Sequence, residues 1–168
     1  MPNLIILVYS GLNLESGQPA RRGRKERGML EYDTSLLEKR CRWIKQVLGD
    51  SLTWKWDDRF DTVLAEFNVR DKAVIQDRLS DQMDIIWTAE TSRRAPEVIQ
   101  ILIDFFGGLN PDQQLFTSDP EIDGILLCAW WPWGNGETIS IRLAVFADSL
   151  NDDQNHELTA LFRGWFGV

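Results

Sequence analysis

The chain has 168 residues, of which 43% are hydrophobic, and its formal net charge at pH 7 is −8. A chain of this length and apolar content can bury its own core, so we expect a single domain over residues 1–168 that needs no metal or disulfide. The excess of acidic groups repels nucleic acid and anionic membranes, which excludes both as expected partners.

The charges are divided unevenly along the chain. Residues 1–45 hold nine Lys and Arg against five Asp and Glu, whereas residues 46–168 hold nine against 21. From Ala95 onward there are 11 acids and two bases, Arg142 and Arg163. A field of this sign attracts basic partners, although acidity also serves solubility alone.

The N-terminal apolar run Leu4–Tyr9 predicts a buried strand. It is too short to span a bilayer and has no basic n-region, so we expect neither a signal peptide nor a membrane anchor. Residues 10–33 are rich in Gly, Ser, Pro and charge and predict a long basic loop, but its cluster Arg21–Lys25 is too short to indicate nucleic-acid binding. Cys41 and Cys128 lie in apolar patterns, which indicates buried thiols and a cytoplasmic protein, and the sequence leaves open whether they approach each other.

Four segments predict helices. The first begins at a capping-box pattern over residues 35–38, and the next two begin near Asp71 and after Pro96. The last begins at Ser149 or Asn151. Three of the four carry an apolar stripe at helical spacing. The stripes are Leu37, Cys41, Ile44 and Leu48; Ile75, Leu79 and Met83; and Leu158, Leu161, Phe162 and Trp165.

Segments with strand-like patterns lie between these helices. Residues 54–56 and 63–69 predict a hairpin, and residues 85–89 predict another strand. The order β-α-β-β-α then repeats, which indicates duplicated halves over 1–83 and 84–168. We therefore expect an α+β fold in which an antiparallel sheet packs against helices on one face and leaves the other face open.

A hairpin with three tryptophans and one proline, within residues 128–146, precedes the last helix. A three-residue loop places Pro132, which has no N–H, opposite Thr138 at a non-hydrogen-bonded site. In this register Trp130 lies on the open face with Arg142 across its ring, and Trp133 lies at the turn. Trp130 is covered instead if a helix or loop packs there. The alternative, a two-residue loop of Asn135 and Gly136, pairs Pro132 with Ile139, at a position where we expect a backbone N–H to be needed.

The sequence contains no metal-ligand cluster, nucleophile elbow or phosphate loop, so we expect no catalytic residues, metal or cofactor. His156 is the only histidine. It lies off the apolar stripe of its helix, which predicts an exposed side chain. Carboxylates gather at the predicted turns, where we interpret them as turn-forming and helix-capping groups instead of metal ligands.

These features favour a binding protein over an enzyme. We expect a small acidic cytoplasmic protein of the inhibitor or immunity type, which neutralises a basic partner such as a toxin or nuclease by charge-steered occlusion. Two interpretations stay open: a small-molecule receptor or enzyme with a pocket lined by Trp54, Trp56 and Trp87, and a structural subunit of an assembly. The sequence does not specify the oligomeric state. The expected partner-binding residues are Trp130, Trp133, Asp119, Glu121, Asp123, Glu137, Asp57 and Asp58.

Overall fold

A computed structural model of the protein describes residues 33–49, 51–122, 124–147 and 149–168. The predicted strand Leu4–Tyr9 and the candidate Asp123 lie outside the described residues. So does the predicted basic loop 10–33 with its cluster Arg21–Lys25, apart from its last residue, Asp33. The duplication of two halves needs that first strand, so it stays a prediction.

The described residues form a six-stranded antiparallel sheet flanked by four α-helices, which confirms the predicted α+β class. The strand order is β1-β2-β6-β5-β4-β3, so the last strand of the chain lies near the centre of the sheet, between β2 and β5. The strands are β1 (Lys55–Asp57), β2 (Thr62–Asn68), β3 (Ile85–Thr88), β4 (Gln114–Thr117), β5 (Ile125–Pro132) and β6 (Thr138–Phe146). The α-helices are α2 (Ser35–Leu48), α3 (Lys72–Ser80), α4 (Glu97–Phe105) and α5 (Asp152–Phe166), and two 3-10 helices are η1 (Val69–Asp71) and η2 (Thr91–Arg94).

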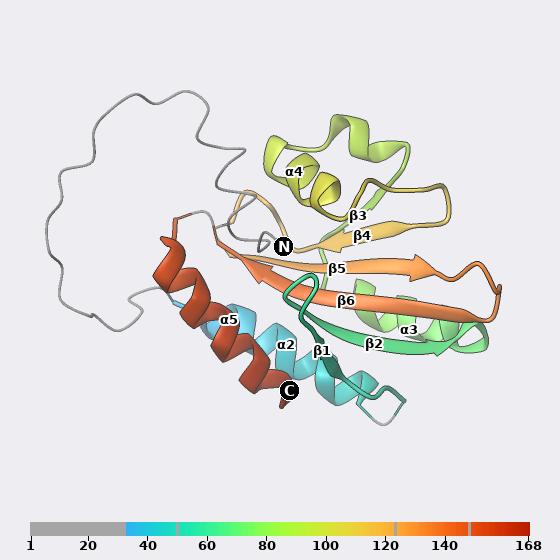
Figure 1. The fold of residues 1–168 in the computed structure, drawn as a ribbon, viewed down its shortest axis with the longest axis horizontal. Coiled ribbons are helices and arrows are strands. Elements are labelled where there is room, and N and C mark those ends of the chain that lie inside the picture. The colour runs from blue at the N-terminus through green and yellow to red at the C-terminus, as the bar shows by residue number, and fades with distance from the viewer. Residues whose placement is uncertain (1–32, 50, 123, 148) are drawn as a thin grey trace, which may run out of the picture.

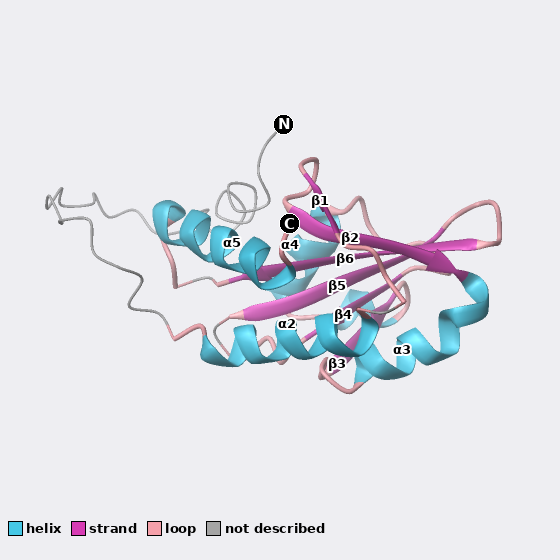
Figure 2. Cartoon of the chain, turned by 90° about the horizontal axis from the view of Figure 1, so that it is seen from below, coloured by secondary structure: helices cyan, strands magenta, loops and turns pink. Residues whose placement is uncertain are grey.

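Helices pack on both faces of the sheet. The apolar residues of α2, α3 and α5 form one core with one face, and those of α4 form a second core with the other face. Figure 1 shows α4 beside β3 and β4, and α2 and α5 side by side near β1. In Figure 2, α2 and α3 follow one another along the same side of the sheet. The expectation of one open face is therefore wrong, because α4 covers part of it.

The helix ends follow local capping chemistry. α5 begins with a capping box in which the Asn151 side chain and the Gln154 side chain each accept the other residue's backbone N–H, as the sequence predicts for Asn151. The capping box predicted at the start of α2 is absent, and Asp33 Oδ1 accepts the Ser35 N–H at 2.9 Å instead. The predicted stripes are buried except for Leu161, which is exposed.

The register of the β5–β6 hairpin differs by one residue from the preferred prediction. Pro132 lies opposite Ile139, and the Trp133 N–H donates to the Thr138 carbonyl at 2.8 Å, which closes a four-residue loop. This loop makes Trp133 and Thr138 the hydrogen-bonded pair and leaves Pro132 at a non-hydrogen-bonded position, where its missing N–H is tolerated. Because side chains alternate between faces, the shift turns Trp130 toward α2, α3 and α5.

Candidate functional site

The antiparallel register divides the predicted site residues between the two ends of the sheet. Asp119 and Glu121 lie in the loop that leads into β5, and Asp58 lies at the same end, in the β1–β2 turn (Figure 1). Trp133, which is 47% exposed, and the exposed Glu137 lie at the opposite end, in the β5–β6 loop. The eight residues of β5 separate the two groups by roughly 25 Å. The expected gathering of these acids beside exposed indole rings is therefore wrong.

Trp130 is a core residue and cannot contact a partner. It is 1% exposed, and its ring centroid lies 5.3 Å from that of Phe67 and 5.9 Å from that of Phe116. Arg142 does not cross the ring of Trp130 as predicted. Its guanidinium lies over Phe60, 5.4 Å from the ring centroid. Both corrections follow from the helices that cover the two faces of the sheet and from the observed register.

Asp57 is also unsuited to contact a partner, because it is buried. Its Oδ2 accepts from Arg142 Nε at 3.1 Å, and its Oδ1 accepts from Arg59 Nε at 3.1 Å. Burial raises the pKa of Asp57, but the hydrogen bonds from Arg59 and Arg142 outweigh this effect and hold that pKa below its usual value. The carboxylate therefore joins the edge strand β1 to the central strand β6.

Two depressions flank Ile122 in the loop between β4 and β5. A narrow cleft is lined by Ile122 and by Leu36 on α2, and a hollow of about 380 Å³ is lined by Ile122 together with Val98, Ile125 and Phe146. Ile122 and Leu36 are each 49% exposed. We call this cleft and hollow, with the residues that line them, the Ile122 groove.

Carboxylates border the Ile122 groove. Asp84 and Asp119 line its cleft, and Glu121 lines its hollow. Neither Asp119 nor Glu121 forms an ion pair with the described residues. Among the described residues that line the groove, Arg40 is the one cation, and its charge is paired with Asp84. The groove therefore presents apolar side chains within a negative border.

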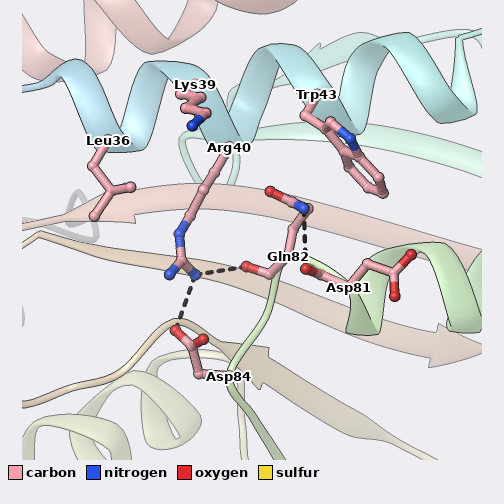
Figure 3. A pocket seen from close by; sticks show the side chains of 7 residues that line it. All are labelled: Leu36, Lys39, Arg40, Trp43, Asp81, Gln82 and Asp84. Atoms are coloured by element: carbon pink, nitrogen blue, oxygen red, sulfur yellow. Dashed lines mark hydrogen bonds and ion pairs between the residues drawn. The ribbon is translucent and has the colours of Figure 1, made fainter.

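Asp84 connects the segments that form the groove. Its Oδ2 accepts from Arg40 Nη1 at 2.9 Å and from the backbone N–H of Asp119 at 2.9 Å. Arg40 Nη1 also donates to the Gln82 carbonyl at 2.7 Å. Figure 3 shows Arg40 extending from α2 across to Gln82 and Asp84. These bonds position α2, the start of β3 and the β4–β5 loop relative to one another.

A further hollow, of about 340 Å³, shares Leu36, Arg40 and Asp84 with the cleft of the Ile122 groove. It lies between α2 and the segment that joins α3 to β3, as Figure 3 shows. The remaining lining residues are Lys39, Trp43, Asp81 and Gln82.

The pocket of three tryptophans that one of the alternative interpretations requires does not form. Trp54 and Trp56 pack on the face covered by α2 and α5, whereas Trp87 packs on the face covered by α4. The sheet separates them, so they cannot line one cavity. His156 is exposed, as predicted. In the part of the chain that the structure describes, no three His, Cys, Asp or Glu side chains are placed to bind one metal ion, and no helix has the length and apolarity needed to cross a membrane.

Sequence reasoning missed Leu36, Arg40 and Ile122. Leu36 lies next to the apolar stripe of α2 but outside it, which is a local signal of an exposed apolar side chain. Ile122 lies between two acids, Glu121 and Asp123, which is a similar signal. Arg40 carries no such signal, because its partners are distant in the sequence.

No protein-family model, curated protein or solved structure matches this chain.

Proposed function

We propose that the protein is a small acidic binding protein of the cytoplasm, of the inhibitor or immunity type. It neutralises a basic protein partner, such as a toxin or nuclease. The residues of the Ile122 groove bind the partner's cationic surface and block it. The observation that carries this proposal is the pair of half-exposed apolar side chains, Ile122 and Leu36, bordered by carboxylates from separate segments.

The groove combines the two features that a charge-steered interface needs. Anchoring side chains at the centre of an interface provide most of its binding energy, whereas charges at the rim speed the encounter and select the partner. Ile122 lines both depressions and is half exposed, so it can anchor a partner, and the hollow lined by Val98 and Phe146 can accept an apolar side chain of the partner. Asp119 and Glu121 form no ion pair with the described residues, so their charges can meet Lys or Arg of the partner.

Affinity capture from the native host, with bound proteins identified by mass spectrometry, tests the proposal. The protein should retain a basic partner at low salt and release it as the salt concentration rises, because salt screens charges at an exposed rim. Capture of only neutral or acidic proteins contradicts the proposal.

Matched variants connect the captured partner to the groove. Ile122→Asp and Glu121→Lys should each weaken its binding at least about tenfold, or about 1.4 kcal/mol. Glu137→Lys makes the same change of charge as Glu121→Lys at the opposite end of the sheet, and it should retain the partner. Equal loss in the two Lys variants shows that net charge, and not the groove, governs binding.

A further inference from the structure

We propose that the hollow in Figure 3 binds a free apolar α-amino acid. The Asp81 carboxylate receives the ligand's ammonium group, the Lys39 ammonium receives its carboxylate, and the indole of Trp43 contacts its side chain. This site is a function separate from partner neutralisation and does not depend on it.

The charged residues of the hollow indicate a ligand that carries one positive and one negative group. Lys39 lies on the α2 wall and Asp81 on the opposite wall, and neither forms an ion pair with the described residues (Figure 3). The other two charged residues of the lining, Arg40 and Asp84, are paired with each other. Lys39 and Asp81 are both exposed, and a ligand with a single charge can pair with only one of them. A zwitterion satisfies both groups.

The size of the hollow and its apolar side chains restrict the class of ligand further. Its volume of about 340 Å³ is near the lower limit for ligand sites, which suits a molecule of amino-acid size. Trp43 is half-buried, so its ring is held by the protein while one part stays open to a ligand. Figure 3 shows Trp43 and Leu36 at the two ends of the hollow, with Lys39 between them on α2. An apolar side chain can therefore pack on the indole while the charged groups reach Lys39 and Asp81.

Hydrogen bonds hold the two walls in place without a ligand. Arg40 Nη1 donates to the Gln82 carbonyl at 2.7 Å, and Gln82 Nε2 donates to the Asp81 carbonyl at 3.0 Å. Arg78 Nη1 donates to the Val47 carbonyl, which ties α3 to the end of α2. Such contacts reduce the entropy lost on binding, so a small ligand needs fewer new interactions.

Isothermal titration of the full-length protein with L-leucine and L-phenylalanine tests the proposal. At least one should bind saturably. Leucine amide lacks the carboxylate and N-acetylleucine lacks the ammonium group, and each should bind at least tenfold more weakly than leucine. Absence of saturable binding of both amino acids below about 10 mM overturns the proposal, as does equal binding of leucine and its two analogues.

Variants assign the two charged groups. Lys39→Gln should remove the preference for leucine over leucine amide, and Asp81→Asn should remove the preference for leucine over N-acetylleucine. Lys72→Gln and Asp77→Asn make the same changes at exposed positions of α3 outside the hollow and should keep both preferences. If Lys39→Gln and Asp81→Asn keep both preferences, the amino acid binds elsewhere and the proposal is wrong. If a variant does not fold, the analogues still decide the outcome on the wild-type protein.

Discussion

The Arg40 guanidinium and the Asp84 carboxylate lie 2.9 Å apart, although 44 residues separate them in the chain. The same Asp84 oxygen accepts the backbone N–H of Asp119. One carboxylate oxygen thus joins α2 to the β4–β5 loop, and both the Ile122 groove and the hollow beside it depend on that junction.

Loss of the Asp84 carboxylate should loosen this junction. Asp84 is 44% exposed, so its ion pair is screened by water, and we expect Asp84→Ala to lower the free energy of unfolding by about 1–2 kcal/mol. Asp84→Asn should lower the free energy of unfolding by less, because an amide oxygen can still accept the Asp119 N–H. Urea denaturation measures both changes. Asp112→Ala, at an exposed turn, is the control and should change stability by less than about 0.5 kcal/mol.

Truncation of two tryptophans tests the register of the β5–β6 hairpin. Trp130→Ala should lower the free energy of unfolding by about 3–5 kcal/mol, since it opens a cavity between Phe67 and Phe116. Trp133→Ala should have a much smaller effect, within about 1 kcal/mol, because that side chain is half exposed. Denaturant unfolding followed by far-UV circular dichroism gives both values. Similar losses for the two variants are incompatible with the pairing of Pro132 with Ile139.

Asp57 should make the free energy of unfolding depend on pH in the acid range. Burial opposes its ionisation, but Arg59 and Arg142 hold its pKa below the usual value in the folded state. A depressed folded-state pKa contributes stability above the unfolded-state pKa of about 3.9, and that stability is lost as the pH falls through the folded-state pKa. Asp57→Asn should be less stable than the wild type at pH 7 and should lose less stability on acidification. Urea titrations at a series of pH values check this, and parallel curves for the two proteins rule it out.

The Asp61 carboxylate should change stability with pH in the opposite direction to Asp57. Burial and the neighbouring Asp58 raise the pKa of Asp61, although His156 and Arg163 partly offset the rise. A raised folded-state pKa means that the ionised carboxylate destabilises the native state at neutral pH. The backbone of Asp61 is also left-handed, with φ of 51°, a conformation that Asn tolerates well. Asp61→Asn should therefore stabilise the protein at pH 7 by about 0.5 kcal/mol and less at low pH. Thermal unfolding at both pH values measures the difference.

The two thiols should be unreactive in the folded protein. Cys41 and Cys128 are free and fully buried. Burial raises the pKa of both thiols, with a further contribution from Glu38 at Cys41. Because the thiolate is the reactive form, a disulfide reagent such as DTNB should label neither cysteine until denaturant unfolds the chain. Rapid labelling of either one under native conditions contradicts their burial.

Local patterns were sufficient to predict most of the elements in the described residues. The spacing of Leu37, Cys41, Ile44 and Leu48 predicted α2 and its buried face, and Asn151 marked the start of α5. Such features depend on helix periodicity and on backbone groups within a few residues, so the sequence contains them directly.

The site was predicted only in part. Asp119 and Glu121 were predicted as partner-binding acids, but Leu36 and Arg40, which line the cleft together with Asp119, come from α2, a distant segment of the chain. Trp130 was placed on the wrong face because its orientation depends on the register of the hairpin, which turns its side chain toward the face covered by α2, α3 and α5. The alternation of apolar and polar residues along a single strand does not specify this register.

The amino-acid sequence alone determined the α+β class, the amphipathic helices and the negative charge of the C-terminal part, because each arises from short-range spacing or from composition. Tertiary structure decided which indole rings stay exposed, that Asp57 is buried between two arginines, and that Leu36 and Ile122 form one groove. These outcomes depend on strand register and on contacts between distant segments. A shift of one residue reverses the two faces of a strand, and contacts such as Arg40 with Asp84 exist only once the segments have packed together.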